Sequence, residues 1–274
     1  MSRIRARGVL TSIVMIPVAC LVGLPFYYIL VNTLKTQQQV ATSPLDPPSG
    51  WHIENYASVF RTIPVGQSFL NTVYVTVASV ALMLLIGSLA AYGVIVSASR
   101  ITRWMAGALL IGFVVPFQTT LIPLYQDLAK FNLVDSLNGL VVVYSAGSIF
   151  CYFLIQGYMR TVPREILEAA RIDGAGPLRI YWSVVVPLIR PILVTVGVFQ
   201  TMWVWNDFLT PQVFISTPRK ATLVLQVYTA VGEFAVDWPL FMTLTVVVLV
   251  PMVIFFLFMQ RHIVSGLVSG GVKV

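Results

Sequence analysis

Long runs of apolar residues, almost free of charged side chains, dominate this chain of 274 residues. A helix needs about 20 mainly apolar residues to cross a bilayer, and six segments reach that length. They are roughly Val9–Leu34, Ser68–Ser97, Trp104–Leu124, Leu137–Met159, Val184–Trp205 and Leu240–Phe258. Only 10% of the residues are charged, whereas a soluble domain carries about 25%. The chain is therefore predicted to be an all-α integral membrane protein with six transmembrane helices.

Basic residues are distributed unevenly over the segments between these spans. With the N-terminus inside, twelve of them fall on the cytoplasmic side: Arg3, Arg5, Arg7, Arg100, Arg103, Arg160, Arg164, Arg171, Arg179, Arg190, Arg261 and Lys273. Five fall outside: Lys35, Arg61, Lys130, Arg219 and Lys220. Because Lys and Arg are enriched in cytoplasmic loops, both ends are predicted to face the cytoplasm of a cell-membrane protein. The same bias accounts for the net charge of +7. The chain is therefore expected to contact membrane lipid and not to bind nucleic acid.

One cytoplasmic segment, residues 160–187 between the fourth and fifth spans, carries a spaced motif. Glu168-Ala169-Ala170 is followed after three residues by Gly174, and after nine more by Val184-Val185-Val186-Pro187. This pattern resembles the EAA loop of ABC-transporter permeases, E-A-A-x3-G-x9-I-x-L-P, with valines in place of the isoleucine and leucine. Asp173-Gly174-Ala175 resembles the form found in the sugar-importer branch. The resemblance is to permeases of binding-protein-dependent, type I importers and implies their transmembrane fold.

The same resemblance extends over nearly the whole chain. Its further motifs are Asn71-Thr72, Ile122-Pro123-Leu124-Tyr125, Asn132-Leu133-Val134-Asp135, Trp205-Asn206-Asp207-Phe208 and the tail from Gly266 to Lys273. Together they are most similar to the maltose-type second permease subunit of carbohydrate importers. The implied domains are 1–67 with the first span and an outer loop, 68–262 as the ABC type-1 transmembrane core with the coupling loop, and 263–274 as a cytoplasmic tail.

In that family the EAA loop is the surface that docks on a separate ATPase. The implied docking residues are Glu168, Ala169, Ala170, Arg171, Asp173, Gly174 and Ala175. The implied partners are a second homologous permease, two copies of a cytoplasmic nucleotide-binding ATPase, and an extracytoplasmic solute-binding protein that the segment Asp207–Pro239 would face. ATP and Mg²⁺ belong on the ATPase, and the implied function is import of a carbohydrate by alternating access.

Residue types around the motif predict a helix, a break and a second helix. Pro163 suits the first turn of a helix, where its missing N–H costs little. Gly174 suits a left-handed helix end, after which Gly176-Pro177 restarts the chain. Glu168 lies at helical spacing from both Arg164 and Arg171, where opposite charges pair.

Polar residues inside the apolar runs mark a candidate translocation path, because polar groups that face lipid are costly. They are Asn71, Thr72, Gln118, Thr119, Tyr144, Ser145, Ser148, Gln200, Trp203 and Asn206. Amides, hydroxyls and aromatic faces suit a neutral sugar. Hydrogen bonds between helices explain the same residues, and both interpretations remain open. The prolines of the spans likewise indicate either local kinks or hinges; they are Pro116, Pro123, Pro187, Pro191 and Pro251.

The sequence shows no signature of chemistry of its own. No G-x-x-x-x-G-K-[ST] occurs, so the chain is not predicted to bind ATP, and no catalytic residue or metal ligand is expected. Cys20 and Cys151 lie in apolar runs and are predicted to be small buried side chains, while His52 and His262 stand alone. Two alternatives remain: import of a non-sugar solute such as glycerol phosphate or a polyol, and a standalone ion-coupled carrier. The carrier would need ionisable residues within its spans, which hold almost none.

Overall fold

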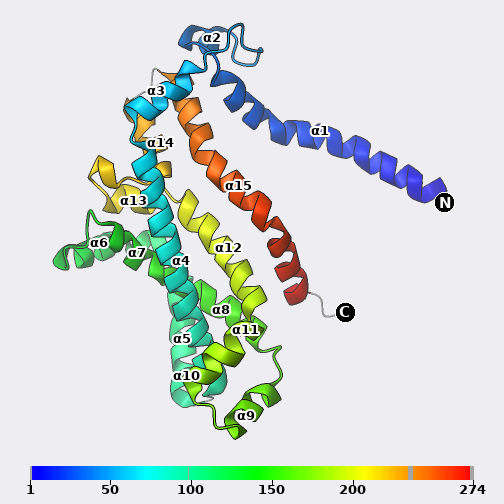
Figure 1. Cartoon of the computed structure of the whole chain (residues 1–274), viewed down its shortest axis with the longest axis vertical. Helices are drawn as coiled ribbons and strands as arrows, with labels where there is room; N and C mark the ends of the chain where they lie inside the picture. The colour runs from blue at the N-terminus through cyan, green and yellow to red at the C-terminus, as the bar shows by residue number, and fades with distance from the viewer. Residues whose placement is uncertain (1, 98, 234–236, 272–274) are drawn as a thin grey trace. The chain divides into compact units, whose positions relative to one another are not determined.

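The computed structural model describes residues 2–97, 99–233 and 237–271, and within these ranges the chain forms helices and no strand (Figure 1). Four helices are long and apolar enough to cross a membrane: Met15–Asn32, Val65–Val96, Leu137–Met159 and Trp238–Arg261. Two further helix pairs qualify but are bent, Arg100–Val114 with Phe117–Lys130 by 92° and Pro177–Leu188 with Arg190–Asn206 by 77°. The predicted all-α class is confirmed, with four candidate spans, or six if each bent pair counts as one.

The third predicted span is broken, which corrects the expectation of one continuous helix. Helix α5 (Arg100–Val114) ends just before Pro116, a 3₁₀ turn η1 (Phe117–Thr120) follows, and α6 (Leu121–Lys130) leaves in a new direction. Proline cannot donate a backbone hydrogen bond, and its ring excludes the helical conformation of the residue before it. The residue before it, Val115, is accordingly extended.

The fifth predicted span is bent for a similar reason. It comprises α10 (Pro177–Ile180), a π-helical turn η3 (Tyr181–Val185), α11 (Val186–Leu188) and α12 (Arg190–Asn206). Pro187 and Pro191 flank the bend and remove two backbone donors from it. Not every proline breaks a helix here, since Pro251 lies inside the continuous α15 (Trp238–Gly271).

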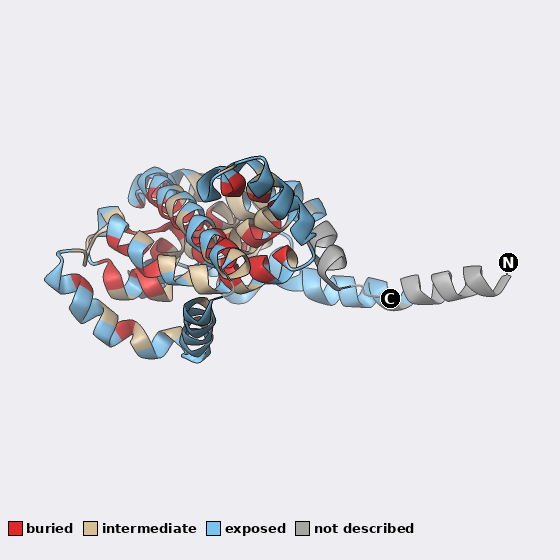
Figure 2. Ribbon diagram, turned by 90° about the horizontal axis from the view of Figure 1, so that it is seen from below, coloured by how far each residue is buried: buried red, intermediate tan, exposed pale blue. Residues whose placement is uncertain are grey.

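One compact unit comprises residues 67–225 and the described residues from 252 onward. Its core lies where α4 (Val65–Val96) and α12 meet the fourth span, which consists of α7 (Leu137–Tyr144), η2 (Ser145–Gly147) and α8 (Ser148–Met159). Figure 2 shows buried residues along the inner faces of the helices and exposed ones outside. Helices α4 and α8 can approach closely because Gly87 has no side chain: an added Cβ would lie 2.6 Å from Cβ of Cys151. Small residues are common at such interfaces between membrane helices.

The other unit comprises residues 1–66 and 226–251. It holds α1 (Ser2–Asn32), most of α14 (Leu223–Glu233) and the first part of α15, together with two short helices that the loop prediction for residues 35–67 missed. These are α2 (Gln37–Thr42) and α3 (Glu54–Thr62). Thr36 and Gln39 form a capping box at the start of α2, a helix signal that could have been read from the sequence.

Lys35 is a buried residue of this unit and binds the segment that follows α2. Its side chain is only 1% exposed, and Nζ donates to the carbonyl oxygens of Ser43 at 2.7 Å and Pro44 at 3.1 Å. Burial lowers the pKa of Lys35, since water no longer solvates the ammonium group. Asn55 holds the backbone on either side of Leu34, because its Nδ2 donates to the carbonyl oxygens of Thr33 at 2.9 Å and of Lys35 at 3.1 Å.

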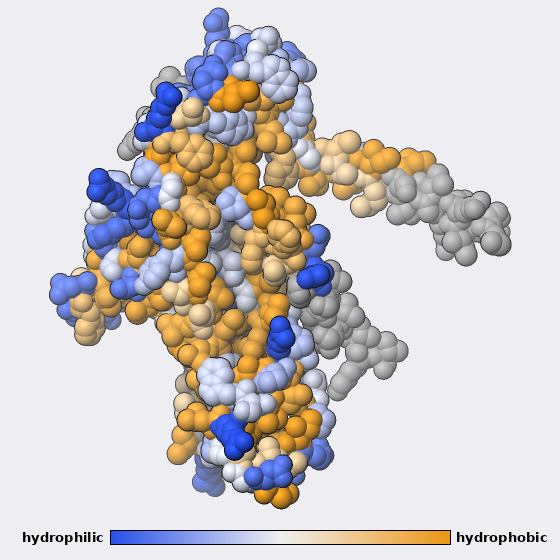
Figure 3. Space-filling model, viewed as in Figure 1, coloured by the Kyte–Doolittle hydropathy of each residue, from blue (hydrophilic) through white to orange (hydrophobic). Residues whose placement is uncertain are grey.

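Apolar side chains cover the outer faces of the spans. The described residues of α1 are exposed almost throughout, Leu21 by 72%, and Ile111 and Val114 of α5 are similarly open. Figure 3 shows such residues over much of the visible surface. The exposure extends to Cys20, which corrects the prediction that it is buried, whereas Cys151 is fully buried as predicted. Helices with this surface suit a lipid environment.

A carboxylate clamp fixes the segment between α13 (Leu209–Phe214) and α14. Asp135 accepts hydrogen bonds from the backbone N–H groups of Ser216 and Thr217 at 3.0 and 2.9 Å, from Oγ1 of Thr217 at 2.6 Å, and from Nζ of Lys220 at 2.9 Å. Lys220 belongs to the short turn η4 (Pro218–Lys220). These bonds, those from Thr217 first, hold the pKa of Asp135 well below its usual range.

The ionised clamp therefore persists at neutral and mildly acidic pH. It weakens only as the pH falls below about 3.9, where an ordinary Asp takes up a proton. Below that pH the unfolded carboxyl binds its proton while the folded one resists it, so the stabilisation is progressively lost.

We expect Asp135→Asn to release the segment around Arg219 and Lys220. The amide keeps one acceptor but loses the charge that attracts Lys220, at a cost of about 1.5 kcal/mol, or roughly a tenfold change in opening. Limited trypsin digestion after Arg219 or Lys220 should accelerate accordingly. Asp127→Asn is the matched control, because Asp127 forms a solvent-exposed ion pair with Lys130. Exposed ion pairs contribute little to stability. Equal digestion of both variants would contradict the clamp.

Candidate functional site

The predicted docking motif lies on α9 (Arg164–Ile172) and the turn that follows it. Pro163 immediately precedes the helix, and Glu165 occupies the first turn, where a carboxylate complements the helix dipole. Leu167 is the buried residue of α9, and Ala170 packs against the same core. The predicted helix and its start are thus confirmed to within a residue. In Figure 1, α9 lies next to α10 at the end of the unit where α5 begins.

The end of α9 is a Schellman turn built around Gly174. The N–H of Ala175 donates to the carbonyl of Ala170 at 3.0 Å, and that of Gly174 donates to the carbonyl of Arg171 at 3.0 Å. This pattern requires a left-handed residue, and Gly174 has φ of +76°. Gly176 and Pro177 then start α10, as the sequence predicted.

The motif presents a mainly exposed surface. Glu168, Ala169, Arg171, Asp173 and Gly174 are exposed, while Ala170 and Ala175 are half-buried against the core. The half-buried pair fixes the backbone, and the exposed residues are free to meet a partner.

Sequence reasoning missed two apolar members of this surface. Ile172 is 87% exposed at the tip of α9, and Leu178 is 71% exposed on α10. Ile172 falls off the buried face defined by Leu167 and Ala170, so helical spacing could have flagged it. Both side chains add apolar area to the exposed surface of α9 and α10.

The ion pairs predicted from helical spacing do not form. Within the described chain, neither Arg164 nor Arg171 has a carboxylate oxygen of Glu168 within 4 Å. Ion pairs between solvent-exposed side chains contribute little free energy, so an arginine can adopt another rotamer at little cost. Arg164 instead points into a pocket beside α9.

The turn that follows the motif is tied to α4 by two tyrosines. Tyr92 donates its hydroxyl to the carbonyl of Pro177 at 3.0 Å, and the Tyr181 hydroxyl lies 2.7 Å from Oγ of Ser88. The rings of Tyr92 and Tyr181 also pack, with centroids 5.5 Å apart. These contacts join α10 and η3 to the C-terminal half of α4.

The polar residues predicted to mark a path fall into separate groups. Asn71 donates to the carbonyls of Arg219 at 2.8 Å and Ala221 at 3.1 Å and accepts from Gln67, and Thr72 accepts from the N–H of Leu223. Both residues therefore hold backbone in place, which is the interhelical bonding considered above as the alternative.

Gln200 and Trp203 come together on α12. They line a recess of about 320 Å³ with Gly147, Phe150 and Phe199. Gln200 is 5% exposed, and its Nε2 donates to the carbonyl of Gly147 at 3.1 Å and contacts the sulfurs of Met83 and Cys151. Its Oε1 accepts no hydrogen bond from any residue that the structure describes.

Tyr144 lies beside this recess. Its ring meets that of Trp203 edge to face at 5.5 Å, and its hydroxyl donates to Asp207 at 2.9 Å. Asp207, which sequence reasoning did not select, also accepts from the N–H of Leu209 and so starts α13. The buried hydroxyl thereby fixes the C-terminal end of α12.

The remaining candidates are scattered. Gln118 and Thr119 are exposed on η1, and Ser145 and Ser148 are half-buried on η2 and α8. Asn206 is exposed and donates to the carbonyl of Met202 in its own helix.

The described residues contain no group of three or more His, Cys, Asp or Glu side chains that could hold a metal ion. His52 lies against Glu54 at 2.7 Å. The side chain of His262 and residues 272–274 of the predicted tail lie outside what the structure describes.

Residues 83–269 match the family of the binding-protein-dependent transport system inner membrane component. The chain belongs to this family. It is an ABC-transporter permease and, with its several apolar helices, a multi-pass protein of the cell membrane. The resemblance stated from the EAA motif is confirmed.

Two curated relatives cover almost the whole permease. The probable starch degradation products transport system permease protein AmyC of Thermoanaerobacterium thermosulfurigenes is 32% identical over 252 residues, 91% of either chain. The melibiose/raffinose/stachyose import permease protein MelC of Bacillus subtilis strain 168 is 30% identical over 274 residues, 99% of either chain. A crystal structure of a bacterial ABC transporter for import of the acidic polysaccharide alginate matches with a TM-score of 0.80 at 21% identity, covering 94% of the permease and 96% of that chain. That similarity shows the fold.

We expect Gly174→Ala to loosen the end of α9 in the permease. An added Cβ would touch nothing within 4 Å, so the cost is the left-handed backbone alone, about 1–2 kcal/mol. Amide hydrogen exchange at Ala175 should become about tenfold faster. Gly176→Ala is the matched control, since that site is equally open but has φ of −69°. Exchange that accelerates in neither variant would show that the turn does not depend on Gly174.

Proposed function

We propose that this permease is the membrane-spanning, non-catalytic subunit of an ATP-driven importer that moves a carbohydrate across the cell membrane by alternating access. The observation that carries the proposal is the α9 turn, an exposed EAA surface that is fixed to the helical core and continues directly into a span. In this proposal each bent pair counts as one span, giving six, and both termini face the cytoplasm. Residues 68–262 form the transmembrane core between the segment 1–67 and the tail 263–274.

The ATPase partner is inferred from what the docking surface offers. Glu168, Arg171 and Asp173 present charges of both signs, and Ile172 presents an apolar tip between them. Such a mixed surface suits a protein partner with an apolar pocket and a basic rim. Two copies of that ATPase would bind ATP and Mg²⁺, and this chain would bind neither.

Coupling follows from the bonds that anchor the surface. Closure of the ATPases around ATP would displace α9 and α10, and the contacts of Tyr92 and Ser88 would pass the displacement to α4. The bends at Pro116 and in the fifth span supply places where helix segments can tilt separately. The spans would then open outward, and hydrolysis would reset them.

Two further partners complete the proposed assembly. The family description names dependence on a binding protein, which would deliver substrate to the outer surface that the Asp135 clamp holds in place. The largely exposed apolar face of α1 supports a second, homologous permease beside this one.

The recess around Gln200 is the part of the predicted path that best suits a sugar. Trp203, Phe150 and Phe199 offer aromatic faces, and Oε1 of Gln200 offers an acceptor for a hydroxyl group. No charged side chain lines it, which favours a neutral solute over glycerol phosphate. The names of AmyC and MelC, which refer to starch degradation products and to oligosaccharides, support a carbohydrate.

The docking proposal is tested with Glu168→Lys in the purified complex in lipid. Reversing the charge at the centre of the surface should abolish most substrate-stimulated ATP hydrolysis and uptake while the complex still inserts in the membrane. Hydrolysis and uptake are measured in the same proteoliposomes. Glu165→Lys is the matched control, because it makes the same charge change one turn earlier on α9 and outside the motif.

Selective loss in the Glu168 variant supports docking at the EAA surface. Unchanged hydrolysis in that variant would reduce α9 to a capped surface helix and overturn the proposal. Equal loss in both variants would assign the effect to the net charge of α9.

For the path, we expect Trp203→Ala to weaken transport of the sugar about tenfold at low substrate concentration, and Trp203→Phe to weaken it less. Trp203 is 42% exposed, so the change removes a stacking face with little effect on the core. Initial uptake rates of labelled oligosaccharides measure the effect. Trp104→Ala, at an exposed tryptophan away from the recess, should leave uptake unchanged; equal effects of the two alanine variants would contradict the path.

A further inference from the structure

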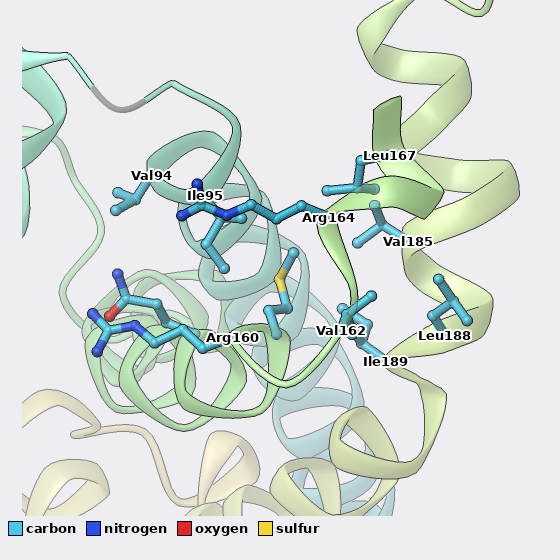
Figure 4. Close-up of a pocket in the computed structure, with 11 residues that line it drawn as sticks. Val94, Ile95, Arg160, Val162, Arg164, Leu167, Val185, Leu188 and Ile189 are labelled. Atoms are coloured by element: carbon cyan, nitrogen blue, oxygen red, sulfur yellow. The ribbon is translucent and has the colours of Figure 1, made fainter. Parts of the chain in front are cut away.

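A second pocket, of about 390 Å³, lies beside α9 where the ends of α4 and α8 meet the bend of the fifth span (Figure 4). Its lining combines two arginines with apolar side chains. In Figure 4 the side chains of Arg160 and Arg164 extend to the side where Val94 and Ile95 lie, and Leu167, Val185 and Leu188 lie on the opposite side. One end of the pocket thus carries both arginines among apolar residues, and the other end is apolar.

The two arginines have no protein partner in the part of the chain that the structure describes. Neither side chain has a carboxylate within 4 Å, and neither donates a hydrogen bond to another described residue. A guanidinium group offers five donors that match the oxygens of a phosphate. Two such groups that line one pocket, with no carboxylate paired to either, offer donors to an anion.

The position of the pocket indicates the source of that anion. Arg160 is the first residue after the candidate span Leu137–Met159. If that span crosses the membrane, the Arg160 guanidinium lies at the depth of the lipid headgroups. Basic pockets between helices at this depth recruit anionic headgroups. The apolar end, with Leu167 and Leu188, suits an acyl chain and gives nothing to a small soluble anion.

We propose that this pocket binds one anionic phospholipid, with its phosphate bound by Arg160 and Arg164 and part of an acyl chain against Leu167 and Leu188. Bound there, the lipid bridges the end of α8 and the start of α9. It would therefore hold the docking helix against the membrane boundary. The proposal requires that α8 ends at a membrane surface, and it does not depend on which solute is carried.

The test is a lipid titration of the purified full chain in a neutral detergent, with bound lipid counted by native mass spectrometry. Phosphatidylglycerol should bind in preference to phosphatidylcholine. The double variant Arg160→Gln with Arg164→Gln should bind phosphatidylglycerol about tenfold more weakly, as expected for loss of charge-assisted hydrogen bonds. Leu188→Gln, at the apolar end, should also weaken it. Far-ultraviolet circular dichroism checks that each variant keeps its helix content.

The matched control is Arg100→Gln with Arg103→Gln, a second pair of exposed arginines at the start of α5. Unchanged binding in this control, with loss in the pocket variant, supports the site. Equal loss in both would mean that net charge attracts the lipid, which overturns the pocket. A further arm adds glycerol 3-phosphate, which carries the phosphate without acyl chains. Displacement of the lipid by glycerol 3-phosphate at equal concentration would overturn the lipid assignment in favour of a soluble anion.

Discussion

A backbone that crosses lipid must satisfy its own hydrogen bonds, and the architecture of this permease depends on that constraint. It explains why the described chain is helical, and it also explains how the breaks are tolerated. At the break in the third span, the hydroxyl groups of Thr119 and Thr120 donate to the carbonyls of Pro116 and Phe117, each at 2.7 Å. Residues chosen from the sequence as path candidates can thus serve the backbone first, as Asn71 does for residues 219–221.

The sequence predicted the helical class, the approximate spans and the helix–turn–helix of the docking loop because these follow from local chemistry. Gly174 shows this best, since a left-handed helix end can be inferred from one residue type and its position. The bends of the third and fifth spans and the partners of Asp135 could not be predicted. Proline marks where a helix can break, but neighbouring helices decide whether it does, and Pro251 lies within an unbroken helix. Arg164 shows the same limit, because spacing predicted a pair with Glu168 and tertiary structure offered a pocket instead.

The two faces of α9 differ in their surroundings, since one packs against the core and the other is exposed. One side holds it in place through Leu167 and Ala170, while Glu168, Arg171 and Ile172 on the other side are exposed. The proposed lipid site lies on the anchored side and the proposed ATPase contact on the exposed side. A change in membrane composition would then alter the rigidity of the docking element without touching the protein interface itself.

Hydrogen bonds between distant segments also bear on the proposed topology of six crossings. In that topology, two residues that bond at one membrane surface are separated by an even number of crossings. Asp135 and Lys220 would be separated by two, Leu137–Met159 and the bent pair that ends at Asn206. Asn71 and Arg219 would be separated by these two, by most of Val65–Val96 and by the other bent pair. The proposed topology meets this parity condition at both hydrogen bonds.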